Sequence, residues 1–256
     1  MLGLERPPRW GITALTIATL ANVALFSYLG VRPTSADSPA APPSPAAATA
    51  TVSAPVTATS ASEAAVQEAT PVLAVYGDGY SAGSSRGGQA DAGWPALVAQ
   101  AVGADLRLNA VPRTGYTAPG ESGQDFAAVA AARPVPDAAV TVVFGSRNDA
   151  SASPALVETK AAQTFEEIRS QAPGTKLIVV GPAWSSDQVP DDLTGVRNAV
   201  QAAATRAGAA FVDPLADHWF DQPRDLIADD GISPTNEGHQ YLADRIGPTV
   251  AAALAG

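Results

Sequence analysis

The segment AVYGDGYSAG, residues 74–83, joins an apolar run to a tight turn of small residues. A strand that leads into such a turn is where many hydrolases place a nucleophilic serine. A serine there would attack an ester carbonyl while a histidine accepts its proton. The residue after Asp78 is instead Gly79, which has no side chain. The segment therefore predicts either a hydrolase with its nucleophile elsewhere or a hydrolase-like fold that does not hydrolyse.

Three further segments contain polar residues and glycines that could form a site together with this turn. They are PRTGY (112–116), GSRND (145–149) and DDGISPTNEGH (229–239). The first two follow candidate strands, and the third precedes the last helical pattern. Because open α/β sheets bind ligands beyond the carboxyl ends of their strands, we expect the segments to meet at that edge.

The elements that must position these segments alternate along the chain. Continuous apolar runs are typical of strands buried on both faces, and stretches between them have helical character. We expect strands at 72–76, 105–109, 139–144, 176–180 and 209–213, and helices near 93–103, 123–132, 155–172, 191–207 and 236–254. This alternation predicts an α/β fold with a five-stranded parallel sheet between two layers of helices.

In their order and spacing, the four segments resemble the sequence blocks of the SGNH (GDSL-type) hydrolase family over residues 71–254. Gly79 stands where the family's Gly-Asp-Ser block has its serine. Ser146 stands where the Gly-x-Asn-Asp block has its glycine, and Ser233 where the Asp-x-x-His-Pro block has its histidine. The resemblance implies a flavodoxin-like, three-layer α/β/α fold.

The resemblance also implies roles for residues that this chain keeps. The N–H groups of Gly79 and Gly115 and the side chain of Asn148 would stabilise an oxyanion and bind substrate. Asp230 would be the remaining member of the catalytic triad, with the nucleophile position vacated at Gly79 and the base position vacated at Ser233. With these two positions vacated, we expect a pseudo-hydrolase that binds an acylated or glycan ligand of the cell envelope, or a protein partner.

Other side chains could replace the missing groups, and each has a simpler interpretation. Ser81 follows the nucleophile position by two residues, and we expect it to face elsewhere, since a sharp turn exposes one side chain. Ser84 and Ser85 belong to a Gly/Ser loop, His218 to a long connection, and His239 to the apolar face of the last helix. An esterase or acyltransferase with a displaced nucleophile and base remains an alternative, as does a purely structural protein.

Arg147 is the remaining candidate for ligand contact. An arginine at the carboxyl end of a strand can bind a carboxylate or phosphate, but it could equally pair with Asp78 or Asp149. Ser233, which precedes Pro234 at the start of a helix, also suits a helix cap. No metal-ligand spacing is present, and we expect no cofactor.

Composition restricts the partners. The chain of 256 residues has a net charge of −10 and shows no basic patch, which argues against nucleic acid. It has no cysteine, which excludes disulfides and thiolate metal sites.

The N-terminal region predicts a membrane anchor. Residues 1–9 would be a short cytoplasmic segment, and the uncharged residues 10–30 could span roughly 30 Å as a single transmembrane helix. Residues 31–70, rich in Ala, Pro, Ser and Thr, predict a disordered linker to a domain at 71–256. The arginines before the apolar segment place the domain on the extracytoplasmic side of the cell membrane. Cleavage of a signal peptide remains the alternative.

Overall fold

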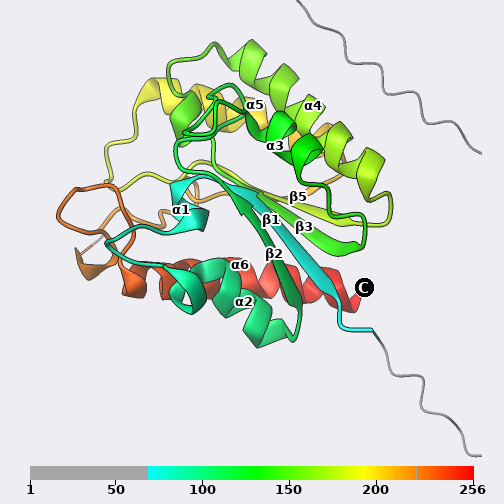
Figure 1. Cartoon of the computed structure of the whole chain (residues 1–256). Helices are drawn as coiled ribbons and strands as arrows, with labels where there is room; N and C mark the ends of the chain where they lie inside the picture. The colour runs from blue at the N-terminus through cyan, green and yellow to red at the C-terminus, as the bar shows by residue number, and fades with distance from the viewer. Residues whose placement is uncertain (1–68, 223) are drawn as a thin grey trace, which may run out of the picture. The chain divides into compact units, whose positions relative to one another are not determined.

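The computed structural model describes residues 69–222 and 224–256, which form a five-stranded parallel sheet between two layers of helices (Figure 1). The strands are β1 (Val72–Gly77), β2 (Asp105–Ala110), β3 (Ala138–Phe144), β4 (Lys176–Val180) and β5 (Ala210–Val212). Their order in the sheet is β2-β1-β3-β4-β5, and every neighbouring pair is parallel. This is the flavodoxin-like order, so the predicted α/β class and parallel sheet are confirmed.

The helices cover both faces of the sheet. They are α1 (Gly79–Ala82), α2 (Trp94–Val102), α3 (Phe126–Ala132), α4 (Pro154–Gln171), α5 (Asp191–Arg206) and α6 (Asn236–Ala255), with short 3-10 turns η1 (Ala90–Ala92), η2 (Arg147–Asp149) and η3 (Arg224–Leu226). Helices α3, α4 and α5 lie on one face, and α2 and α6 pack together on the other (Figure 1). The five longer helices match the predicted ones to within a few residues.

Local sequence explains where several helices begin. Asp125, Ser153 and Thr235 are the N-cap residues of α3, α4 and α6, and each side chain accepts a hydrogen bond from the backbone N–H three residues on. Pro154 occupies the first turn of α4, where its missing N–H leaves no helical bond unmade.

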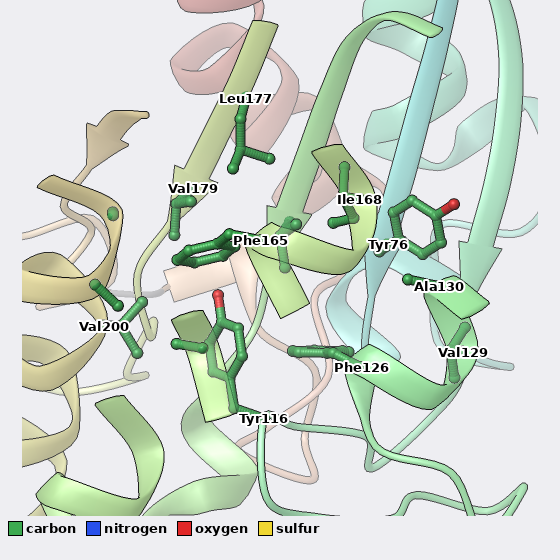
Figure 2. Packing of buried hydrophobic residues seen from close by; sticks show 14 of the residues in the cluster. Tyr76, Tyr116, Phe126, Val129, Ala130, Phe165, Ile168, Leu177, Val179 and Val200 are labelled. Atoms are coloured by element: carbon green, nitrogen blue, oxygen red, sulfur yellow. The ribbon is translucent and has the colours of Figure 1, made fainter. Parts of the chain in front are cut away.

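Two apolar clusters fill the space between the sheet and its helical layers. Figure 2 shows the cluster beneath α3, α4 and α5, in which the rings of Tyr116, Phe126 and Phe165 pack edge to face. The second cluster joins the opposite face of the sheet to α2 and α6 and includes Trp94 and Phe144. Burial on both faces explains the continuous apolar runs of the central strands.

The edge strand β2 departs from the prediction of full burial. Its residues are partly or largely exposed, and Asp105, Arg107 and Asn109 alternate with apolar positions. Strand β2 lies at the edge of the sheet, where only one of its sides is hydrogen-bonded to a neighbouring strand. Charged and polar side chains are common on such edge strands because they oppose pairing with another chain.

The predicted anchor at 10–30 and the linker at 31–70 lie outside the described residues, except for 69 and 70. Within residues 69–222 and 224–256, none of the helices has the length and apolar character that crossing a bilayer requires.

Candidate functional site

A cleft of about 720 Å³ lies at the carboxyl edge of the sheet. Gly79, Asn148 and Ser233 all line it, as predicted from three separate segments of the sequence. Two predicted site residues, Gly115 and Asp230, do not line it. The size of the cleft is typical of a pocket for a small organic ligand.

Gly79 begins α1 directly after β1, and it leaves part of the cleft open. The preceding Asp78 is the N-cap of this short helix, and its Oδ1 accepts a hydrogen bond from the Tyr80 N–H at 2.9 Å. A Cβ atom built on Gly79 would meet no atom within 4 Å. The backbone therefore presents position 79 to the cleft, but no hydroxyl stands there.

Ser81 faces away from the cleft, as we expected. Its side chain is buried and lies against Gly77, and its hydroxyl has no hydrogen-bond partner. A nucleophile needs access to substrate and a neighbouring base, and Ser81 has neither among the described residues.

Ser233, which lines the cleft, forms a tight local pair with Asp230, which precedes it in the sequence. Asp230 accepts hydrogen bonds from the Ser233 N–H at 2.8 Å, the Ser233 hydroxyl at 2.7 Å and the Ile232 N–H at 2.9 Å. These bonds, those of Ser233 first, lower the pKa of Asp230 to about 2. The carboxylate is ionised and oriented, but the group that it orients is a hydroxyl rather than an imidazole.

Asn148 is held at the base of the cleft by two acceptors. Its Nδ2 donates to Asp78 Oδ2 at 3.0 Å and to the carbonyl of Thr114 at 2.9 Å. An amide nitrogen carries two hydrogens, so both are used within the protein. Asn148 thus lies in the cleft as predicted, but its amide hydrogens point to acceptors within the protein rather than into the cleft.

Asp78 itself is buried and has a perturbed acidity. Burial raises the pKa of its carboxyl to about 6, against the opposing effects of the Tyr80 N–H and the Arg147 guanidinium.

The predicted role of Gly115 as a free oxyanion donor is wrong for this geometry. Its N–H donates to the carbonyl of Ala118 at 3.0 Å, inside the loop that follows β2. A side chain at this position would collide with the carboxylate of Asp149, which explains why glycine is required here for a reason other than catalysis.

Asp149 is the residue that shapes this loop, and the sequence interpretation missed that function. The buried carboxylate accepts hydrogen bonds from the N–H groups of Tyr116, Thr117 and Ala118 and from the Thr117 hydroxyl, at 2.7–3.1 Å. The alternative in which Asp149 pairs with Arg147 is therefore wrong. In the sequence, the one signal was an acid at the end of GSRND, which follows β3, together with a glycine-containing loop after β2.

Arg147 lines the cleft and is held by aromatic groups rather than by acids. Its guanidinium carbon lies 4.5 Å from the centre of the Trp184 ring, and its NH1 approaches the Tyr80 hydroxyl at 3.4 Å. Burial raises the pKa of Tyr80 to about 12. Tyr80 and Trp184 were not among the predicted site residues, although Trp184 follows the carboxyl end of β4 and that position could have indicated it.

Neither histidine lines the cleft. His239 is fully buried, where its Nδ1 accepts a hydrogen bond from the Trp94 N–H at 3.3 Å, and burial lowers its pKa to about 4. This is the predicted packing role. His218 is exposed and its Nδ1 lies 2.7 Å from Asp221 Oδ2. Among the described residues, no group of three acids or histidines is placed to hold a metal ion.

Comparison with known proteins identifies the relatives of this chain. Residues 75–241 match the GDSL-like lipase/acylhydrolase family. The chain is 39% identical over 192 residues to the GDSL lipase Rv0518 of Mycobacterium tuberculosis. The aligned region covers 72% of this chain and 83% of that protein.

Solved structures share the fold at lower identity. TesA superposes with a TM-score of 0.58 at 21% identity, over 72% of this chain and 99% of that one. A carbohydrate esterase family 2 enzyme of Corynascus thermopiles (Myceliophthora fergusii) superposes with a TM-score of 0.61 at 19% identity, over 73% of this chain and 67% of that one. The ordered segments, the strand order and these matches agree, and the chain belongs to the GDSL-like lipase/acylhydrolase (SGNH) family.

Proposed function

We propose that this domain binds an acylated ligand in the cleft at Gly79 without hydrolysing it. The observation that carries the proposal is the absence of an attacking group where the fold would present one. Position 79 is open and has no hydroxyl, and the nearby Ser81 is buried against Gly77. Acyl transfer through a covalent intermediate needs an activated nucleophile at this point.

The second missing part is the base. Ser233 cannot accept a proton at neutral pH as an imidazole does, and its hydroxyl donates to Asp230 at 2.7 Å. His239 lies in the core and His218 on an exposed loop, so neither lines the cleft.

The direction of the amide donors supports the same proposal. The Gly115 N–H and both Asn148 N–H groups make hydrogen bonds within the protein. Loss of one oxyanion donor lowers turnover by roughly 10²–10³. A ligand can still use the shape and apolar lining of the cleft, because binding does not need these donors.

The relatives indicate the ligand class. One is named a lipase, another a carbohydrate esterase, and a further solved relative is named a salicylyl-acyltransferase. We therefore propose an acyl group, free or carried on a glycan or lipid of the cell envelope, as the ligand, and an N-terminal anchor at residues 10–30 that keeps the domain outside the cytoplasm. A protein partner at the same cleft is the alternative binding role.

The lipase name of the closely similar relative favours one second candidate, an esterase with a displaced nucleophile. Ser84 and Ser233 are the serines that line the cleft and would be its nucleophiles. This candidate predicts turnover that disappears in Ser84→Ala or Ser233→Ala.

A paired test uses two glycines with open Cβ positions and no left-handed backbone. Gly79→Leu would fill the cleft, whereas Gly174→Leu places the same side chain at the exposed turn before β4. With p-nitrophenyl butyrate, we expect saturation-transfer NMR to detect binding to the parent and to Gly174→Leu, but not to Gly79→Leu. Nitrophenol release should stay at the buffer rate throughout. Binding that survives Gly79→Leu, or nitrophenol release well above buffer by the parent, would refute the proposal.

A further inference from the structure

Arg147 is a cleft-lining cation without an acidic partner among the described residues. None of the ion pairs within 69–222 and 224–256 includes it. The other arginine of the cleft, Arg113, lies 3.8 Å from Glu121 and its side chain is 82% exposed. Only Arg147 combines partial burial with an unpaired guanidinium at this site.

The acids near Arg147 are engaged elsewhere. The carboxylate of Asp78 accepts hydrogen bonds from the Tyr80 N–H and from Asn148. The carboxylate of Asp149 accepts hydrogen bonds from the loop after β2, and that of Asp230 accepts them from Ser233. Asp78 is close enough for its charge to interact with Arg147, but the two make no direct ion pair. The N–H groups of Arg147 therefore remain available on the cleft side.

Packing holds the guanidinium in position before any ligand arrives. One face lies over the Trp184 ring at 4.5 Å. The Tyr80 ring that meets its NH1 is itself fixed edge to face by Phe144 and Phe220, with centroid distances of 5.9 and 6.2 Å. A guanidinium has five N–H donors in a planar fork, and this contact uses one. Because stacking already holds the guanidinium, it loses little conformational freedom when it binds a carboxylate through two parallel hydrogen bonds.

The rest of the cleft offers apolar surface. Pro112, Ala118 and Pro234 line it, and Ile232 is 50% exposed, one of three large apolar side chains with such exposure in the described domain. The open space above Gly79 connects this surface to the polar base of the cleft. An aliphatic chain would cover this surface while its polar end meets Arg147.

We infer that the cleft recognises a free aliphatic carboxylate, whose head is bound by Arg147 and whose chain packs on Ile232 and the two prolines. This inference rests on the proposed non-hydrolytic binding function and specifies its ligand as the acid rather than the neutral ester. An ester lacks the second anionic oxygen that a bidentate pair with arginine requires.

Calorimetry on the full-length chain tests the inference with octanoate, methyl octanoate, acetate and octyl phosphate. We expect octanoate to bind at least about tenfold more tightly than methyl octanoate or acetate, and more tightly than octyl phosphate. Arg147→Gln should weaken octanoate binding by at least about tenfold and leave methyl octanoate unchanged, while Arg147→Lys should recover only part of the loss. Arg113→Gln, the matched control at the mouth, should stay within about twofold of the parent, since an exposed, loosely paired charge contributes little. Thermal melts should show that each variant is folded.

Several outcomes would overturn the inference. If octanoate and its methyl ester bound with equal affinity, the carboxylate would not be recognised. If acetate bound as tightly as octanoate, the aliphatic chain would not contribute to binding. Preference for octyl phosphate, or an equal effect of Arg113→Gln, would assign the site to anions in general. Binding of methyl octanoate without octanoate would refute this inference and leave the proposed function in place. Cleavage of methyl octanoate would instead refute the proposed function.

Discussion

Ser146 has a backbone φ of 85° and ψ of −9°, a left-handed conformation that favours glycine. The family pattern has glycine at this point, so the serine is strained. Ser146→Gly should relieve roughly 1–2 kcal/mol of strain and lose about 0.4–1 kcal/mol through the freer unfolded chain. We expect a net gain of about 0.5–1 kcal/mol in the free energy of unfolding, measured by urea denaturation. Ser151→Gly, at a turn without positive φ, should lose stability; a loss of the same size in Ser146→Gly would contradict the assigned strain.

Asp78 should make stability depend on pH. Its pKa is raised to about 6 in the folded state, chiefly by burial, from an ordinary value of 3.8. Between these values the folded state holds a proton that the unfolded state releases, so the free energy of unfolding falls as pH rises from about 4 to about 6. The fall attributable to this group is about 3 kcal/mol. Asp78→Asn should flatten that part of the curve, whereas Asp105→Asn on the exposed strand β2 should not. An unchanged slope in Asp78→Asn would refute the burial argument.

Residue types and motif order revealed part of the site but not its hydrogen bonds. Gly79, Asn148 and Ser233 could be placed in one cleft because each follows a strand or precedes the last helix. The inward direction of the Asn148 amide and the use of the Gly115 N–H depend on acceptors contributed by other segments. Such directions follow from three-dimensional packing, which one-dimensional spacing does not contain.

The conformation of the loop after β2 depends on η2. Asp149 accepts four hydrogen bonds from Tyr116, Thr117 and Ala118. Hydrogen bonds to a charged group contribute about 1.5–3 kcal/mol each, although not additively, so Asp149→Ala should reduce stability by at least about 3 kcal/mol. Hydrogen exchange should show lost protection at the N–H groups of residues 116–118. Ser153→Ala, which removes the N-cap of α4, should cost only about 1 kcal/mol and leave that protection intact. Retained protection in Asp149→Ala would show that packing alone holds the loop.

Strands and helices were predictable because their patterns are long and repeated. Strands β1, β3, β4 and β5 were located to within about two residues. The first three are almost entirely apolar because they are buried on both faces of the sheet, whereas β5 is a short edge strand whose residues are exposed or half-buried. The exposure of β2 and the four-residue helix α1 were not predictable in this way. Sheet order decides which strand is an edge, and a single turn of helix has no periodicity to detect.

We expect the N-terminal segment of the chain to tether the acidic domain outside the cytoplasm. The proposal depends on the uncharged residues 10–30 after two arginines. A reporter enzyme fused after residue 70 should be exported and remain with the membrane fraction. Replacing two residues of the apolar segment, Leu20 and Leu25, with arginine should abolish export of the fusion, whereas alanine at both positions should retain it. Release of a soluble reporter beginning near Asp37 would show that the signal is cleaved.

We propose that the chain keeps the fold of its family but lacks the nucleophile and the base. Gly79 has room for a serine side chain, and Asp230 already orients whatever group stands at position 233. Gly79→Ser or Ser233→His alone should change little, because nucleophile and base act as a unit. The double variant should gain on the order of 10²-fold in hydrolysis of p-nitrophenyl butyrate over the parent, far below the ~10⁶ of a full triad, since the Asn148 and Gly115 donors face inward. Asp230→Asn should remove that gain.

The most direct measurement is therefore nitrophenol release by the parent and the double variant under the same conditions. Nitrophenol release by the parent should follow the buffer rate, and release by the double variant should lie well above it. Robust turnover by the parent, abolished by Ser84→Ala or Ser233→Ala, would contradict the account and establish a displaced nucleophile.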